Sequence, residues 1–101
     1  MPVSPEEFLE DFLRAFCEDL TKEKRRGKTL FFCGDYLTGT VADLGDRKAI
    51  TVYSGRSGDR MHVDLLKRAK EVYHGSLVDG GTYQSSGVDG VFYYTFVHVK
   101  L

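Results

Sequence analysis

The last eleven residues constrain the fold most, because their pattern predicts one long strand that is apolar on both faces. Over residues 91–101 the side chains alternate between two sets. One set is Val91, Tyr93, Thr95, Val97 and Val99, and the other is Phe92, Tyr94, Phe96, His98 and Lys100. At about 3.3 Å per residue such a strand spans roughly 36 Å, which is long for a small sheet. It is therefore either a central strand covered on both sides or a strand with one face sheltered by another subunit.

A helix is predicted at the N-terminus. Ser4 is its expected N-cap, Pro5 takes the first helical position, and a glutamate three residues after the serine completes a capping box. Apolar residues recur with a helical period as far as Leu20, and basic residues follow up to Arg26. We therefore expect one helix from Pro5 to Arg26, with Gly27 as its stop.

Short alternating runs follow and predict an antiparallel meander. They cover residues 29–33, 36–43 and 49–53. Turns are expected between them at Gly34 and Gly45. Gly39 inside the middle run indicates either a bulge or a close approach of another part of the chain. A second helix is predicted over residues 60–74, with one narrow apolar face, and a weak strand over residues 82–86.

These elements predict a single α+β domain over residues 1–101, in the order α-β-β-β-α-β-β, with two helices packed on an antiparallel sheet. The length of 101 residues fits one domain, and seven Phe, six Tyr and only two Pro exclude a disordered chain. No apolar run approaches the roughly 20 residues of a membrane-spanning helix. The N-terminal residues lack the basic and apolar regions of a signal peptide, so we expect a protein that is not secreted.

Side chains that could carry chemistry are few and scattered. Cys17 and Cys33 are too few for a disulfide framework and lack the spacing of metal ligands, so we expect buried thiols in a reducing compartment. His62, His74 and His98 fall on an apolar helix face, at a helix end and near a strand end. No two of them have the i, i+4 spacing of a helical zinc motif. The sequence therefore predicts no catalytic residue, no metal site and no cofactor.

Two basic clusters form a candidate nucleic-acid patch, which consists of Lys24, Arg25, Arg26, Lys28, Lys67, Arg68 and Lys70. The order of elements over residues 5–74 resembles a double-stranded-RNA-binding domain, whose last helix opens with lysines. Here the basic residues of that helix fall in its middle instead. Residues 55–58, GRSG, are similar to the GXXG loop of KH domains, but a strand precedes them. With 14 basic and 15 acidic residues, the composition disfavours a nucleic-acid partner.

One resemblance covers the whole layout. It is carried by ITVYSG at residues 50–55, AKEVYHG at 69–75 and FYYTFVHV at 92–99. With the N-terminal helix and the meander, the order over residues 5–101 resembles small tail terminator and tail-completion proteins of long-tailed bacteriophages. The long insertion that many members carry between the middle strands is missing here. The resemblance implies a non-enzymatic virion component that forms a ring, usually of six subunits, which ends tail-tube growth and receives the head connector.

The sequence leaves three functions open. The first is a phage-type structural or assembly protein of the virion or the host-cell cytoplasm, which binds proteins and forms a homo-oligomer. Its candidate oligomer interface consists of Phe92, Tyr94, Phe96 and His98. The second is a small inhibitory or immunity-type protein that binds a nuclease or toxin. The third is a nucleic-acid-binding module that uses the two basic clusters.

Overall fold

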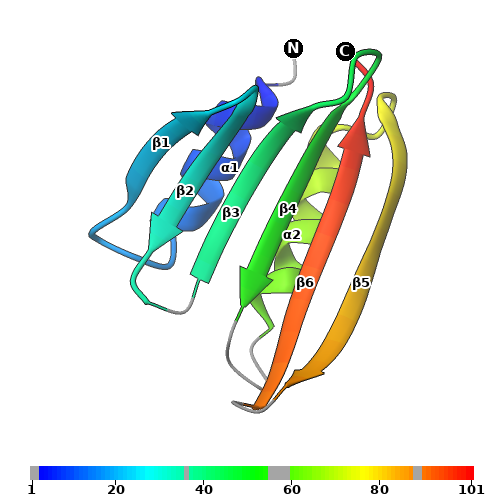
Figure 1. Ribbon diagram of the computed structural model, residues 1–101. Helices are drawn as coiled ribbons and strands as arrows, with labels where there is room; N and C mark the ends of the chain where they lie inside the picture. The colour runs from blue at the N-terminus through cyan, green and yellow to red at the C-terminus, as the bar shows by residue number, and fades with distance from the viewer. Residues whose placement is uncertain (1–2, 36, 55–59, 88–89) are drawn as a thin grey trace.

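The computed structural model describes residues 3–35, 37–54, 60–87 and 90–101. Over these residues the elements are α1 (Pro5–Arg14), β1 (Thr21–Arg25), β2 (Lys28–Cys33), β3 (Leu37–Asp43), β4 (Lys48–Ser54), α2 (Met61–Val72), β5 (Leu77–Gly87) and β6 (Gly90–Val99). The strands form one antiparallel sheet in the order β1-β2-β3-β4-β6-β5, and both helices lie on the same face of it (Figure 1). The predicted α+β class, with two helices packed on an antiparallel sheet, is confirmed. The element order is α-β-β-β-β-α-β-β, which has one strand more than we expected.

The additional strand replaces the end of the predicted N-terminal helix. Ser4 caps α1 as expected, accepting a hydrogen bond from the Glu7 N–H (3.2 Å), but the helix ends at Arg14 rather than at Arg26. The basic residues form β1, which pairs with β2. Arg26 and Gly27 join the two strands with positive φ values of 44° and 78°, as a tight two-residue hairpin turn requires. Pairing with the apolar β2 thus overrides the helical propensity of these residues.

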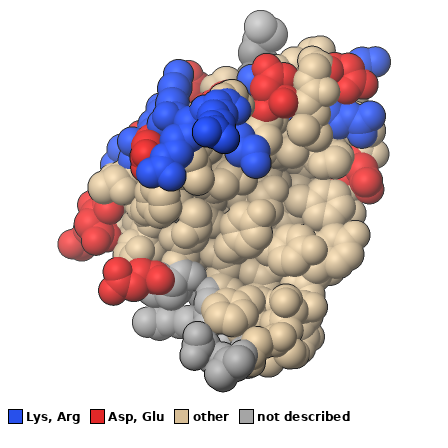
Figure 2. Space-filling model, viewed as in Figure 1, with Lys and Arg blue, Asp and Glu red and all other residues tan. Residues whose placement is uncertain are grey.

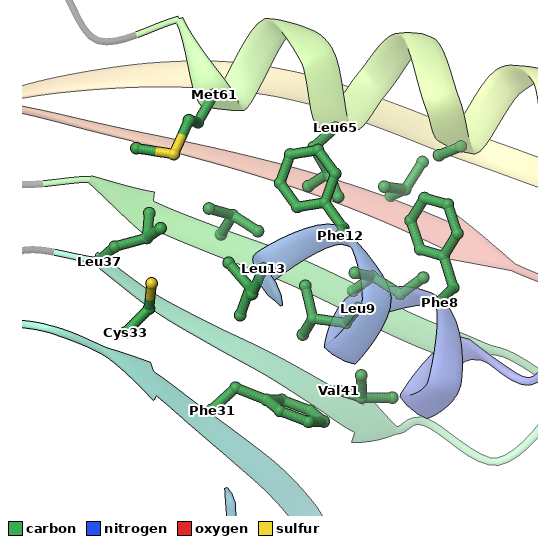
Figure 3. Close-up of a cluster of buried hydrophobic side chains, with 14 of the residues drawn as sticks. Phe8, Leu9, Phe12, Leu13, Phe31, Cys33, Leu37, Val41, Met61 and Leu65 are labelled. Carbon is green, nitrogen blue, oxygen red and sulfur yellow. The ribbon is translucent and has the colours of Figure 1, made fainter. Parts of the chain in front are cut away.

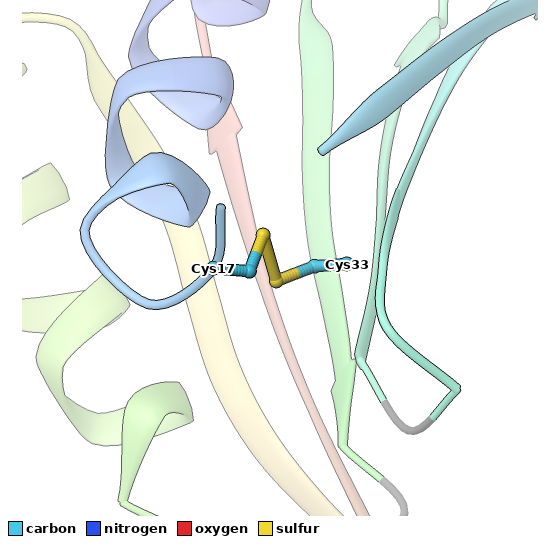
Figure 4. The surroundings of a disulfide bond; sticks show 2 residues. All are labelled: Cys17 and Cys33. Atoms are coloured by element: carbon cyan, nitrogen blue, oxygen red, sulfur yellow. A yellow bond between two sulfur atoms is a disulfide. The ribbon is translucent and has the colours of Figure 1, made fainter. Parts of the chain in front are cut away.

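The cysteines are the second correction, because they are paired rather than free. Cys17, in the loop after α1, and Cys33, at the end of β2, form a disulfide with a Cα–Cα distance of 5.8 Å (Figure 4). The bond connects the helix layer to the sheet and closes a loop that contains β1. The two residues are 16 positions apart, and only the fold brings them within bonding distance.

The hydrophobic core lies between the two helices and the sheet (Figure 3). α1 packs over β2, β3 and β4, and α2 packs over β4, β5 and β6. Under α1, an added Cβ at Gly39 would lie only 2.9 Å from Leu9 Cδ2. Of the two predictions for Gly39, the close approach is therefore correct. The bulge is wrong, because β3 stays in register with both of its neighbours.

β6 lies between β4 and β5 and is paired along both edges. Thr95, Val97 and Val99 are buried on the side of the helices. The other set of side chains lies on the opposite face of the sheet, which no element of the described residues covers (Figure 1). The prediction of a central strand covered on both sides is therefore wrong. That another subunit shelters the second face stays a prediction.

α2 begins at Met61, after Arg60, whose side chain makes no capping hydrogen bond. The KH-like segment, residues 55–58, lies outside the described residues. Across the described ranges, neither helix has the length and hydropathy needed to cross a membrane.

Candidate functional site: the open face of the sheet

The face of the sheet opposite the helices, here called the open face, carries the candidate interface residues. Alternate side chains of a strand point to opposite faces, so the buried residues of each strand identify the covered side. The remaining residues form rows across the sheet, because neighbouring strands are paired in register. From β1 to β5, three rows are Arg25, Lys28, Ala42, Ala49, His98 and Asp79; Glu23, Leu30, Thr40, Thr51, Phe96 and Gly81; and Thr21, Phe32, Thr38, Tyr53, Tyr94 and Tyr83.

Aromatic side chains gather on the open face over β4, β6 and β5. We call Tyr53, Tyr83, Tyr94, Phe96 and His98 the aromatic patch. The Tyr83 ring stacks on those of Tyr94 and Phe96, with centroids 5.1 and 5.5 Å apart. Tyr53 lies 5.6 Å from Tyr94, and His98 lies 5.2 Å from Phe96. These contacts between neighbouring strands arrange the rings as one connected surface.

Much of this surface is accessible to solvent. Tyr83 is 50% exposed, Tyr53 is 47% exposed, and Phe92, beyond the patch on β6, is 39% exposed. Figure 2, which looks onto the open face, shows a broad area without charged side chains over β4, β6 and β5. The patch residues and Thr51 line a shallow depression there. A contiguous apolar area of this kind is typical of an interaction site.

A column of small side chains runs beside the aromatic patch. On β3 it consists of Thr38, Thr40 and Ala42, and we call these three the small-residue column. Leu30 and Phe32 stand on its other side, on β2. Large side chains therefore flank a strip of short ones on the open face.

Charge is concentrated at the two ends of one row. Arg25 and Lys28 lie at the β1–β2 end, where Figure 2 shows Lys and Arg gathered, and Asp79 lies at the β5 end. Arg25 also pairs with Glu23 on its own strand (2.5 Å). Asp79 accepts a hydrogen bond from the Gly80 N–H (2.8 Å). The row is thus positive at one edge of the sheet and negative at the other.

The predicted basic patch is divided between the two layers of the molecule. Its N-terminal cluster lies in the β1–β2 hairpin, and Lys67, Arg68 and Lys70 lie on α2, which packs on the covered face. The Arg68 guanidinium lies over the Phe12 ring, 5.6 Å from its centroid. Arg25 and Lys28 lie on the open face, whereas Lys24, which is paired with the buried Thr29, and the three residues of α2 lie on the side of the helices. The seven residues therefore do not form one patch on one face, a point that the sequence had left open.

The three histidines lie apart. His62 stacks on Tyr93 on the covered side of the sheet (4.9 Å between centroids), His98 lies on the open face, and His74 follows α2. The Nδ1 atoms of His62 and His98 are buried and have no hydrogen-bond partner within the described residues. Among those residues, no three His, Cys, Asp or Glu side chains gather in a way that could hold a metal ion.

Sequence reasoning identified one strand of the aromatic patch and missed its neighbours. Phe92, Tyr94, Phe96 and His98 were predicted as an interface from the alternation in the last strand. Tyr53 and Tyr83 were not predicted as part of it. Register alone reveals them, because both lie opposite Tyr94 on the adjacent strands.

The function has to be inferred from this geometry. No protein-family model matches the chain, and no curated protein or solved structure matches it significantly.

Proposed function

We propose that the protein is a non-enzymatic assembly protein that acts through protein–protein contacts of its open face. The aromatic patch carries this proposal, since its side chains come from three strands, contact one another and are up to half exposed. Covering apolar surface contributes about 25 cal/mol per Å². A protein that covers the patch would therefore gain much of its affinity there.

The arrangement of the rings also favours tight contact. Tyr83 stacks with both Tyr94 and Phe96, at 15–19° between ring planes. Rings that are already positioned lose little rotational freedom on binding, so less of the contact energy is offset by lost entropy. Tyrosine is also enriched among the residues that dominate protein interfaces.

Within this class we propose a phage tail terminator or tail-completion protein, which works as a closed homo-oligomer such as a hexameric ring. Its location would be the virion or the cytoplasm of the host cell. A closed assembly needs further contacts besides the open face. The edges of the sheet at β1 and β5 support this, because edge strands carry backbone groups that can pair with another chain.

A single-stranded nucleic acid is the second candidate partner, since bases stack on exposed aromatic rings and Arg25 and Lys28 lie on the same face. Their positions argue against it. The small-residue column separates both basic side chains from the patch, and Asp79 lies at the patch itself, opposite His98. Oligonucleotide binding that weakens steeply with salt would favour this candidate over the assembly protein.

Native mass spectrometry and sedimentation velocity, over roughly micromolar to millimolar concentrations, test the assembly function. We expect the wild type to associate reversibly into a closed oligomer and Phe96→Asp to reduce this association, because it places a charge in the aromatic patch. Val72→Asp is the matched control, since Val72 is an exposed apolar residue on α2. A wild type that stays monomeric at every concentration would contradict the proposal and favour an inhibitor that binds one other protein.

A further inference from the structure

We propose that the open face binds the open face of a second copy of this chain, related to the first by a two-fold axis that runs along β4. The inference rests on the proposed assembly function and adds the geometry of the contact. The geometry is inferred from the sizes and charges of the side chains that would face one another across the contact.

A two-fold axis along β4 reverses the order of the strands. β6 of one copy then lies over β3 of the other, β5 lies over β2, and β4 lies over β4. Because the axis is parallel to the strands, residues of one row stay in the same row. Sheets stacked face to face lie about 10 Å apart, so a long side chain on one sheet fits best over a short one on the other.

The sizes of the side chains are complementary where β6 lies over β3. The aromatic column of β6 falls on the small-residue column of β3, and symmetry makes this contact twice. The opposed pairs are His98 with Ala42, Phe96 with Thr40 and Tyr94 with Thr38. In the middle row, Leu30 on β2 also falls on Gly81 of β5. In the third row, large side chains also meet, because Tyr53 lies over Tyr53 on the axis and Phe32 lies over Tyr83.

An axis between β3 and β4 would fit less well. It would place Leu30 over Phe96 and Thr40 over Thr51, so that large side chains meet large ones and small ones meet small ones. At a uniform spacing between the sheets, the first kind of pair would clash and the second would leave a void. The axis along β4 also places Thr51 over Thr51 in the middle row, but it avoids the overlap of Leu30 with Phe96.

Charge is complementary in the same arrangement. Lys28 on β2 of one copy lies over Asp79 on β5 of the other, and the reciprocal pair forms on the opposite side of the axis. Both residues are exposed in the single chain. Opposite charges at the rim of an interface set the orientation of the partners more than they add affinity.

The area is sufficient for a reversible dimer. Five strands about 4.8 Å apart and three rows about 6.7 Å apart cover roughly 24 by 20 Å, or about 500 Å² per copy. A total of about 1,000 Å² is at the lower end for a specific interface, so we expect a concentration-dependent dimer rather than a permanent one. The edges of the sheet at β1 and β5 remain unpaired in it and could join such dimers into a larger assembly.

Charge reversal tests the two-fold arrangement. Lys28→Asp alone places two like-charged pairs in its own dimer, and so does Asp79→Lys alone. We expect each variant to associate roughly tenfold to thirtyfold more weakly than the wild type. In an equimolar mixture, a dimer of one variant with the other has opposite charges at both contacts. Sedimentation equilibrium should therefore show association restored to within about threefold of the wild type, and native mass spectrometry should show the mixed dimer in excess.

Lys67→Asp and Glu71→Lys are the matched controls, because they reverse exposed charges on α2, away from the open face. Each should associate like the wild type. The wild type could associate while the mixture of Lys28→Asp and Asp79→Lys associates no more strongly than either variant alone. In that case the two-fold arrangement is wrong and the assembly function stands. A wild type that does not associate at all overturns both proposals.

Discussion

Gly39 of β3 shows how a single residue sets the distance between a helix and the sheet. An added Cβ would lie 2.9 Å from Leu9 Cδ2 and 3.0 Å from Leu13 Cδ1, which is closer than side chains normally pack. We therefore expect Gly39→Ala to lower the free energy of unfolding by about 1–3 kcal/mol, as overpacking does, measured by urea denaturation. Gly75→Ala is the control, because a Cβ there meets nothing within 4 Å. Equal effects at the two glycines would contradict the close packing of α1.

Tyr73 makes the free energy of unfolding depend on pH in the alkaline range. Its hydroxyl donates a hydrogen bond to the Val3 carbonyl (3.0 Å). Burial, and then the charges of Glu6 and Glu7, raise the pKa of Tyr73 to about 12. A tyrosine in the unfolded chain has a pKa of about 10, so the folded state holds a proton that the unfolded state loses. The resulting stabilisation is complete below about pH 10 and is lost as the pH rises toward about 12.

Tyr73→Phe isolates this effect, since it removes the ionisable hydroxyl and keeps the ring. At neutral pH the variant should lose about 1 kcal/mol with the hydrogen bond to Val3. Between about pH 9 and pH 11.5, its free energy of unfolding should fall less than that of the wild type, as measured by denaturation at each pH. Parallel curves would show that Tyr73 ionises as readily in the folded chain as in the unfolded one.

Among the elements, the disulfide is the covalent connection between α1 and the sheet. It closes a loop of about 16 residues. Cross-linking a loop of that length raises the free energy of unfolding by about 3 kcal/mol, because it restricts the unfolded chain. We expect dithiothreitol to lower the free energy of unfolding of the wild type by about this amount. The double variant Cys17→Ser with Cys33→Ser should not respond to the reductant. Two titratable thiols per chain in unreduced protein would show that the bond does not form.

The β1–β2 hairpin contains a residue poorly suited to its turn. Arg26 has a φ of 44°, a region that asparagine adopts far more readily than arginine. Arg26→Asn should therefore raise the free energy of unfolding by about 0.5–1 kcal/mol in chemical denaturation. Lys24→Asn in the adjacent strand should give no such gain, because asparagine is disfavoured in strands. Equal effects of the two variants would argue against the hairpin and for a different backbone in this segment.

At the scale of the whole molecule, we expect the covered face of the sheet to contribute to stability and the open face to self-association. Ile50 is completely buried on the covered face of β4, and Tyr53, three residues on, is 47% exposed on the open face. We expect Ile50→Ala to lower the free energy of unfolding by about 2–5 kcal/mol. Tyr53→Ala should cost less than about 1 kcal/mol, from its ring contact with Tyr94, while weakening self-association. Both are measured at concentrations where the wild type is monomeric. Similar losses of stability would show that the open face contributes to the core.

Features that depend on neighbours in the chain were predictable from the sequence. The cap at Ser4, the positive-φ turns at Gly34 and Gly45, and the apolar face of α2 follow from the conformational preferences of a few consecutive residues. The two faces of β6 follow in the same way, because side chains alternate in any strand. These local signals were sufficient to predict the α+β class and one strand of the candidate interface.

Features that depend on contacts between distant segments were decided only by the tertiary structure. Residues 21–25 have the composition of a helix end, but pairing with β2 makes them a strand. Cys17 and Cys33 meet because the chain after α1 returns to the end of β2. Tyr53 and Tyr83 join the aromatic patch because the register places both beside Tyr94. Strand pairing links residues that are far apart in the sequence, so local preference does not encode it, and the full open face emerges only when the sheet is assembled.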